Sequence, residues 1–306
     1  MTTLVFGHKS PDTDSTGSPI IWAWYLNEVE GGDAEAVLLG EPNTEAAFVL
    51  KRWDLPKPRI ISTIDAGQPV VIVDTNNPAE LPHNINDADI RAIVDHHKLV
   101  GGLETSGPID ITMRPVACTA TILNQMMGDA AARMPDWVKG TMLSCILSDT
   151  LEFRSPTTTE VDRTLAEGLA AELGIDLSAY AAELFAAKSD VSAFSDAELI
   201  RMDSKAYEVG GTKFRVSVLE TTAPEIPLGR SASLMETMPT VAAEDGVDHV
   251  LMFVVDILRE EATLLVPNPV VKEVAEKSFG ATVTGDRVVL PGVMSRKKQI
   301  IPVLSL

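Results

Sequence analysis

The sequence predicts an α/β protein, with a mostly parallel sheet in the first part of the chain and a smaller mixed α/β domain after it. Strand-like and helix-like segments alternate through the first half, which is typical of a parallel sheet covered by helices. The short runs VVIVD and RAIVD are almost continuously apolar, as buried parallel strands are. At 306 residues the chain is also long for one core, so about two domains are expected.

The first domain is expected to begin with the strand-like run TLVFG. The alternation then continues through IIWAWYLNEV, AEAVLLG, NTEAAFVLKRWDL, PVVIVD, DIRAIVDHH, CTATILNQMM and WVKGTMLSCILSDT. The strand-like runs VVIVD and RAIVD each end on an aspartate, which places acidic groups at strand ends.

The pattern changes after the helical segment LAEGLAAELGIDLSAYAAELFAAKSD. The stretch AAKSDVSAFS is predicted to be a linker, and longer strand-like runs such as KFRVSVLETT and VDHVLMFVVDI follow it. These features predict a first domain at residues 1–188, a linker at 189–195 and a second domain at 196–306.

Composition excludes several classes of protein. A net charge of -19 argues against a nucleic-acid partner, because binding to the phosphate backbone depends on a basic surface. No apolar run approaches the roughly 18 residues of a membrane helix, and no charged-then-apolar leader precedes TLVFG, so neither a membrane location nor export is expected. The chain has only Cys118 and Cys145, which predicts two buried thiols and a cytoplasmic protein.

Acidic residues and histidines gather at the ends of the predicted strands. The motif GHKSPDTDS follows the first strand and carries His8, Asp12 and Asp14; VDTN carries Asp74, and DHH carries His96 and His97. Asp149 ends the helix-like run LSCIL. One such aspartate is usually a turn former or a helix cap. Parallel strands align their carboxyl ends along one edge, however, so the set as a whole predicts a metal site.

About four carboxylates and two imidazoles exceed the needs of one divalent ion. Two ions that share a carboxylate would neutralise the repulsion and could bind both the attacking and the leaving oxygen in phosphoryl transfer. Magnesium prefers oxygen ligands and water, whereas imidazoles in such a site suit Mn, Fe or Co. The predicted cofactor is therefore Mn²⁺.

A second candidate feature is the basic run SRKKQ near the end of the chain. Basic runs of this kind are usually solvated turns. Here the run lies between LPGVM and IIPVLSL, which look like strands and would hold it on a framework. Arg296 can offer a bidentate fork and Lys297 a point charge, and both suit phosphate oxygens.

The motifs GHKSPDTDS, VDTN, DHH, PVACTATIL, LSDTLEF and SRKKQ resemble, in this order and over nearly the whole chain, the manganese-dependent inorganic pyrophosphatases. These are the family II enzymes of the DHH phosphoesterase superfamily. The resemblance implies a DHH domain followed by a DHHA2-type domain, two Mn²⁺ per subunit that Co²⁺ can replace, additional Mg²⁺ accompanying the substrate, and a homodimer formed through the first domain.

The resemblance also implies a role for each matching residue. Asp74 would bridge the two metals, and His97 would face the substrate beside phosphate-binding cations in the second domain. The implied metal ligands are His8, Asp12, Asp14, Asp74, His96 and Asp149, and the implied catalytic and substrate-binding residues are His97, Lys205, Arg296 and Lys297. The chain departs from the family pattern at Thr75, where many members have histidine, and this loss of an outer imidazole bears on the tuning of metal affinity.

The predicted reaction is hydrolysis of inorganic pyrophosphate to two phosphates by a hydroxide that bridges the two metals. The alternatives are an exopolyphosphatase, another DHH phosphoesterase such as a single-strand nuclease, and a non-catalytic regulatory or nucleotide-sensing module. Nuclease-type relatives usually carry a glycine-rich GGH-like motif, which this chain lacks, and the acidic charge also disfavours a nuclease. The regulatory module is disfavoured because every expected metal ligand is present.

Overall fold

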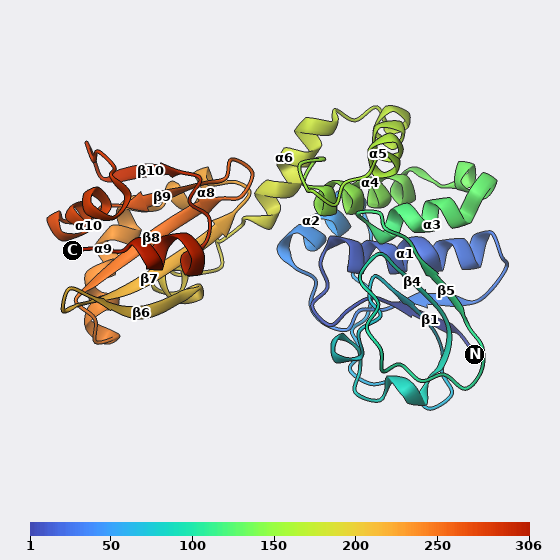
Figure 1. Ribbon diagram of the computed structural model, residues 1–306. Coiled ribbons are helices and arrows are strands. Elements are labelled where there is room, and N and C mark those ends of the chain that lie inside the picture. Colours follow the sequence, from blue (N-terminus) through green and yellow to red (C-terminus); the bar gives the residue numbers. More distant parts are fainter. The chain divides into compact units, whose positions relative to one another are not determined.

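The computed structural model describes residues 1–306 and divides into two compact units, Met1–Ala187 and Lys188–Leu306 (Figure 1). We call them unit 1 and unit 2. None of the helices combines the length and the apolar character needed to cross a lipid bilayer.

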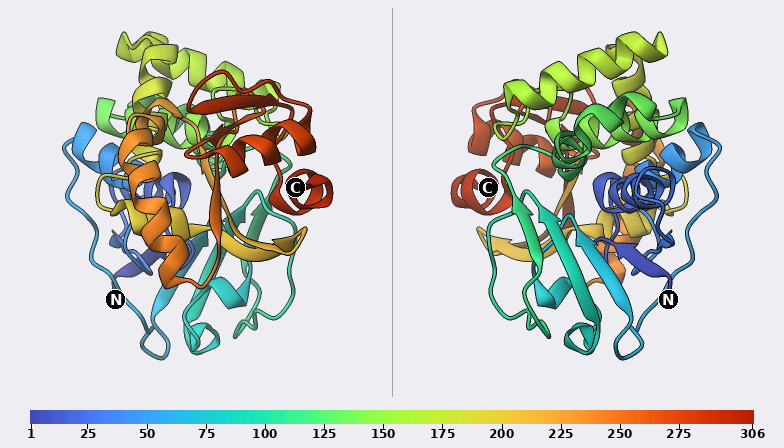
Figure 2. Two further views of the ribbon diagram at one scale, coloured as in Figure 1. Left: turned by 90° about the vertical axis from the view of Figure 1, so that its left-hand side faces the viewer. Right: turned by 90° about the vertical axis from the view of Figure 1, so that its right-hand side faces the viewer.

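Unit 1 contains a five-stranded sheet in the order β2-β1-β3-β4-β5, and every neighbouring pair is parallel. The strands lie side by side in Figure 2. Their bounds are β1 (Thr3–Phe6), β2 (Ala34–Ala36), β3 (Pro69–Val73), β4 (Asp89–Asp95) and β5 (Asp110–Met113). The predicted parallel sheet is thus confirmed, and β5, which the sequence pattern did not reveal, forms one edge of it.

The helices of unit 1 pack mainly through α1 and α4, which contact each other along their lengths. Their approach requires glycine at position 17, because a Cβ there would overlap Cys145 Sγ of α4, and Gly140 of α4 likewise leaves space for the ring of Trp53 at the end of α2. Cys118 and Cys145 are buried free thiols, as predicted. The α-helices of unit 1 are α1 (Thr13–Glu28), α2 (Thr44–Arg52), α3 (Thr119–Met127), α4 (Asp136–Thr150), α5 (Glu160–Leu173) and α6 (Leu177–Lys188). Three short 3₁₀ segments complete it, at η1 (Pro78–Glu80), η2 (Ile85–Asp87) and η3 (Gly128–Arg133).

Unit 2 contains a mixed five-stranded sheet in the order β10-β9-β8-β7-β6, in which only β7 and β8 are parallel. One apolar cluster includes Val271 and Val274 of α10, and a second includes Leu234 and Met238 of α9. The strands are β6 (Ser204–Val209), β7 (Thr212–Thr221), β8 (His249–Asp256), β9 (Glu261–Leu265) and β10 (Arg287–Pro291). The helices are α7 (Asp196–Met202), α8 (Glu225–Leu228), α9 (Ser231–Glu244) and α10 (Pro269–Phe279), followed by η4 (Arg296–Ile300) and η5 (Ile301–Val303).

The end of the chain differs from its prediction. The segment IIPVLSL was expected to be strand-like, but residues 296–303 form a π-helical turn and a 3₁₀ turn, η4 and η5. Pro302 has no amide hydrogen to donate to a strand ladder, and the apolar residues of the segment pack on the unit 2 core instead. The basic run therefore itself forms the turn η4, between β10 before it and η5 after it.

Candidate metal centre

The predicted ligands come together at the carboxyl edge of the unit 1 sheet. His8 follows β1, Asp74 follows β3, and the pair His96 and His97 follows β4. Because β1, β3 and β4 are adjacent and parallel, their carboxyl ends meet at one edge. The C-terminal end of α4 brings Asp149 to the same place, where it forms a group with Asp14 and His96.

Asp12 and Asp14 lie at the start of α1, which begins earlier than the helix-like run IIWAWYLNEV. Asp12 is the N-cap residue, and its carboxylate accepts a hydrogen bond of 2.9 Å from the amide of Ser15. Asp14 lies in the first turn of the helix. Negative charge at a helix N-terminus interacts favourably with the helix dipole, so α1 stabilises the two carboxylates that it presents.

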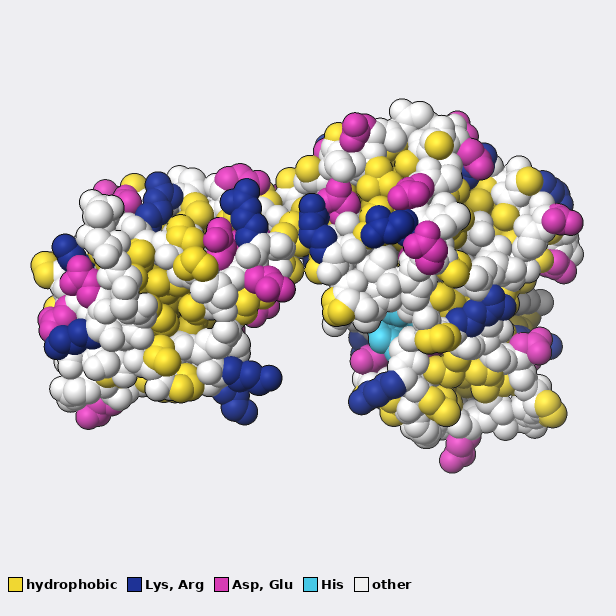
Figure 3. Space-filling model, turned by 45° about the horizontal axis from the view of Figure 1, so that its top comes forward, with side chains coloured by type: hydrophobic (Ala, Val, Ile, Leu, Met, Phe, Trp, Pro, Cys, Tyr) yellow, Lys and Arg dark blue, Asp and Glu magenta, His cyan; other side chains and the backbone are white.

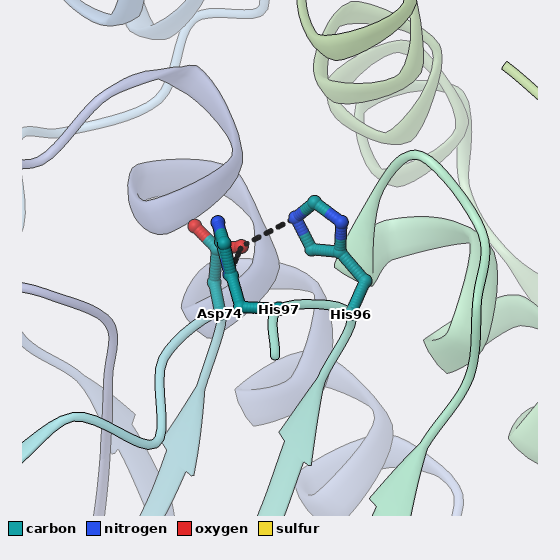
Figure 4. A group of neighbouring side chains, drawn as sticks. All are labelled: Asp74, His96 and His97. Atoms are coloured by element: carbon teal, nitrogen blue, oxygen red, sulfur yellow. Dashed lines mark ion pairs between the residues drawn. The ribbon is translucent and has the colours of Figure 1, made fainter. Parts of the chain in front are cut away.

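Asp74 is the central residue of the group. Its backbone is left-handed, with φ of 60°, yet its amide still donates to Val94 O at 2.9 Å and so remains tied to β4. Its carboxylate lies 3.7 Å from His8 Nε2 and 3.3 Å from His96 Nε2. Figure 4 shows both histidines of the DHH motif beside this carboxylate, with His97 Nδ1 3.9 Å away. The left-handed turn therefore directs a buried carboxylate to the middle of three imidazoles.

Three overlapping groups of side chains have ligand atoms within 4.8 Å of one another. Asp74 belongs to two of the groups, and His96 also belongs to two. The groups are Asp74, His96 and His97; His8, Asp12 and Asp74; and Asp14, His96 and Asp149. The structure thus brings together all the ligands that the resemblance implies, with His97 at the margin.

The electrostatics of the group suit a bound cation. Burial, followed by repulsion from Asp14 and Asp12, raises the pKa of Asp74 and of Asp149 well above the usual range of a carboxyl. The Oδ2 atom of Asp149 is also buried without a hydrogen-bond partner. A divalent ion would supply both the missing partner and the positive charge that keeps these carboxyls ionised, so the residues fit a metal.

The histidines differ in protonation. Burial lowers the pKa of His96, which favours the neutral imidazole that ligates metals. Its Nδ1 lies 3.3 Å from Val116 O, an arrangement in which Nδ1–H donates and the lone pair of Nε2 faces Asp74. For His8, burial opposes protonation, but the contact with Asp12 and the charge of Glu80 outweigh it and raise the pKa. His96 is therefore preorganised as a ligand, and His8 loses a proton when it binds a metal.

His97 is held in a different way. Its Nδ1 lies 2.9 Å from Oδ1 of the fully buried Asp95, and its backbone amide donates to the same oxygen at 3.0 Å. This hydrogen bond raises the pKa of His97, although burial acts against it. Asn76 donates to the other oxygen of Asp95 at 2.5 Å. The half-exposed imidazole is thus oriented and favoured in its cationic form, which suits contact with an anion.

Several residues that contact the ligands were missed by sequence reasoning. Thr119 donates from its amide to Asp14 at 2.6 Å and from its hydroxyl to Asp74 at 3.1 Å. Ser18 donates to Asp14 at 2.5 Å. The motif PVACTATIL contained the available signal, because Thr119 begins helix α3 and a helix N-terminus favours carboxylates.

A cavity of about 480 Å³ lies beside His8 and His97. Figure 3 shows histidine atoms in a hollow on the surface of unit 1. Thr75, at the position of the family departure, is buried and donates from its hydroxyl to Glu80 at 2.7 Å. The other lining residues are Lys9, Ser10, Asn76, Asn77, Ala79, Lys98 and Val100.

The predicted cations of the second domain all lie in unit 2. Lys205 is exposed on β6, and Lys297 is exposed in η4. The Arg296 guanidinium donates to Asp203 O at 2.8 Å and pairs with the Asp203 carboxylate at 2.7 Å. Asp203 directly precedes β6, so Arg296 is tied to the segment that carries Lys205.

Both halves of the chain match known family models. Residues 2–148 match the DHH family, N-terminal domain, and residues 182–306 match the DHHA2 domain. Several relatives carry the name probable manganese-dependent inorganic pyrophosphatase, and two of them show the extent of the similarity. The one from Deinococcus radiodurans is 40% identical, covering 98% of this chain and 96% of its own, and the one from Lactiplantibacillus plantarum is 37% identical, covering 99% and 97%.

Solved structures show the same fold. A structure from Methanococcus jannaschii, described as a candidate family II inorganic pyrophosphatase, is 32% identical with a TM-score of 0.63, covering 99% of this chain and 98% of its own. An exopolyphosphatase-related protein from Bacteroides fragilis is only 12% identical, with a TM-score of 0.50, covering 98% and 89%, and shows likeness of fold alone. The sequence identity, the two matched domains and the shared fold establish that the chain belongs to the family of manganese-dependent inorganic pyrophosphatases, the family II enzymes.

Proposed function

We propose that the protein hydrolyses inorganic pyrophosphate to two phosphates at a manganese centre in unit 1. The observation that carries the proposal is the convergence of three histidines and four aspartates in three overlapping groups, which are linked through Asp74 and His96. The names of the relatives at 37–40% identity support both the reaction and the metal. The proposed ligands are His8, Asp12, Asp14, Asp74, His96 and Asp149.

The donor set favours manganese over magnesium. Imidazole nitrogen combined with carboxylate oxygen suits Mn²⁺ or Co²⁺, whereas Mg²⁺ retains water and oxygen ligands. Asp74 belongs to two of the three groups, so its carboxylate would be the one to hold more than one ion, as the resemblance implies. When bound, such ions lower the pKa of coordinated water and neutralise charge on phosphate oxygens.

The side chains proposed to bind the substrate have separate tasks in this reaction. His97, oriented by Asp95, donates a hydrogen bond to a phosphate oxygen of the substrate. Lys205, Arg296 and Lys297 bind the remaining oxygens and stabilise the negative charge that develops on the leaving phosphate. Transition-state stabilisation by such fixed donors is the main contribution expected of the protein, because phosphoryl transfer needs little covalent chemistry.

A longer polyphosphate is the second candidate substrate. The cavity beside His8 and His97 contains Lys9 and Lys98, and its volume of about 480 Å³ leaves room for a further phosphate group. Glu80 in the same cavity opposes an additional anion, which favours pyrophosphate as the main substrate.

The test is phosphate release from pyrophosphate, tripolyphosphate and a short oligonucleotide, each with Mn²⁺, Co²⁺ and Mg²⁺. We expect pyrophosphate with Mn²⁺ or Co²⁺ to be turned over fastest after chelator treatment. Faster release from tripolyphosphate would instead indicate an exopolyphosphatase, and equal reactivation by micromolar Mg²⁺ would contradict the manganese centre.

The oligomeric state is the next part of the proposal. A homodimer through unit 1 is supported by β5, an edge strand on which Ile111 is 56% exposed. Light scattering should give twice the chain mass, and Ile111→Lys should shift the protein toward monomer if β5 forms the contact.

A cytoplasmic enzyme without a nucleic-acid or membrane partner is supported by the net charge of -19 and the free buried thiols.

A further inference from the structure

Glu45 is a buried carboxylate to which the proposed reaction gives no task. It lies in the first turn of α2 and is fully buried. Burying a carboxylate is costly unless hydrogen bonds compensate for the lost water, so its contacts must supply that compensation.

The contacts of Glu45 link two segments that carry proposed ligands. Thr13 donates from its hydroxyl to Glu45 Oε2 at 2.9 Å, and Ser148 donates to the same oxygen at 2.7 Å. Thr13 lies between Asp12 and Asp14 at the start of α1, and Ser148 directly precedes Asp149 near the end of α4. One oxygen atom therefore joins the two helix ends behind the metal centre.

We propose that Glu45 is a positioning residue that fixes the start of α1 relative to the end of α4, and so sets the spacing of Asp12, Asp14 and Asp149. The inference rests on the metal centre of the proposed function. Asp14 and Asp149 belong to one group of candidate ligands, and the shared acceptor holds in place the two segments that carry them. Hydrogen bonds of this kind fix the orientation of metal ligands and so affect metal affinity.

The backbone beyond Asp149 gives a second reason for such a tether. Immediately after α4 the chain passes through Leu151, Glu152 and Phe153, whose φ values are 48°, 53° and 67°. Left-handed backbone is unfavourable for each of these residues, and it persists only where surrounding contacts hold it. The end of α4 is therefore strained on one side of Asp149, and the hydrogen bond from Ser148 to Glu45 fixes the other side.

The experiment measures Mn²⁺ binding to the chelator-stripped, full-length chain by calorimetry. We expect Glu45→Ala to raise the Mn²⁺ dissociation constant about tenfold to a hundredfold, the usual effect of losing an outer hydrogen-bond partner. Glu45→Gln retains a carbonyl oxygen that can accept both hydroxyls, and should restore most of the affinity. An affinity of Glu45→Ala equal to wild type would overturn the inference.

A matched control separates positioning from simple loss of stability. Asn27 lies at the other end of α1 and makes two hydrogen bonds to Ala34, of 2.9 and 2.7 Å. Asn27→Ala should lower the stability of the metal-free protein without changing Mn²⁺ affinity. If Glu45→Ala fails to fold, Ser148→Ala removes only one of the two bonds, and it should still weaken Mn²⁺ binding severalfold. Unchanged affinity in Ser148→Ala would count against the tether, whereas a wild-type chain that binds no Mn²⁺ would contradict the proposed function itself.

Discussion

At the scale of single residues, Asp74 combines features that rarely occur together. It has a left-handed backbone, it is almost fully buried, and its carboxylate lies near three imidazoles. Aspartate tolerates the left-handed region better than most residues, and strained conformations concentrate at functional sites. The left-handed backbone and the raised pKa of Asp74 both support its proposed role as a metal ligand.

Asp74→Asn should reduce Mn²⁺ binding from two ions per chain to fewer than one. Two of the overlapping groups share this carboxylate, and an amide cannot bridge two cations as a carboxylate can. Elemental analysis after dialysis measures the stoichiometry, with Asp129→Asn, an exposed aspartate, as the control. Loss of a single ion would show that Asp74 binds one metal without bridging.

Lys297→Ala should lower kcat/KM for pyrophosphate about a hundredfold, the scale expected when one partner of the transition-state charge is removed. Metal content should stay unchanged, because Lys297 lies in unit 2 and all the proposed ligands lie in unit 1. The neighbouring Lys298→Ala is the matched control, since both side chains are exposed in η4. Equal effects of the two substitutions would mean that the run SRKKQ acts as a general basic surface, without a specific contact between Lys297 and the substrate.

The sequence predicts ligands better than it predicts their supporting residues. His8, Asp74 and His96 could be placed because each follows an apolar strand, and parallel strands end at one edge. Glu45 and Thr119 could not be placed in this way. Their contacts depend on how helices α2 and α3 pack against α1, and the short-range periodicity of the sequence does not predict that packing.

At the scale of elements, the strands were predicted where apolar runs are short and continuous. The prediction was wrong for IIPVLSL, because an apolar run beside a proline can also pack as a turn. The start of α1 was also misplaced by the pattern. The residues TDST are polar, although they form the buried first turn of the helix, where they serve the site rather than the core.

Asp162 of α5 supports the start of α3, and its substitution can measure that support. It caps α5 through Thr159 and also accepts hydrogen bonds from Ala117 N at 3.1 Å and Thr121 Oγ1 at 2.7 Å around the start of α3. Asp162→Ala leaves these buried donors unsatisfied, so we expect a loss of about 2–4 kcal/mol in the free energy of unfolding. Asn43→Ala, which removes only the cap of α2, should cost about 1 kcal/mol.

Urea unfolding followed by tryptophan fluorescence measures both variants, because all four tryptophans lie in unit 1. Similar losses for Asp162→Ala and Asn43→Ala would mean that the contacts with α3 contribute little.

The stability of unit 2 should depend on pH through the ionisation of Asp245. Hydrogen bonds from Arg201, helped by the charge of Arg215, lower the pKa of Asp245, although burial acts against this. The unfolded state therefore binds the proton of Asp245 more tightly than the folded state does. The stabilisation of the folded state by the ionised Asp245 is complete above the unfolded pKa of about 3.9, and it disappears as pH falls through the lower pKa of the folded state.

Asp245→Asn should cost about 1 kcal/mol at pH 7, the upper range for a partly exposed ion pair. The difference from wild type should narrow as pH falls below 4, as thermal unfolding by circular dichroism can measure. A gap that stays constant over this range would show that packing, rather than charge, stabilises the contact.

At the scale of the whole molecule, the proposed metal ligands and the proposed phosphate-binding cations lie in different units. The chain carries a net charge of -19, and the proposed metal ligands add their carboxylates to it in unit 1, while the proposed phosphate-binding cations belong to unit 2. Pyrophosphate is itself a polyanion. Its binding therefore requires local positive charge, which bound metals can supply in unit 1 and the basic side chains can supply in unit 2.

The affinity for a non-hydrolysable analogue shows whether both sources of charge are used. With Mn²⁺ bound, the full-length chain should bind imidodiphosphate at least about tenfold more tightly than a chain that ends at Lys188. Charged hydrogen bonds to phosphate contribute about 1.4 kcal/mol or more, and 1.4 kcal/mol corresponds to about a tenfold change in affinity. The shortened chain must first show wild-type tryptophan fluorescence and Mn²⁺ stoichiometry. A full-length variant with Lys205, Arg296 and Lys297 all changed to alanine provides the second comparison, and it should bind as weakly as the shortened chain. If both bind imidodiphosphate as tightly as wild type, the cations of unit 2 take no part in substrate binding, and recognition rests on the metal centre and His97 alone.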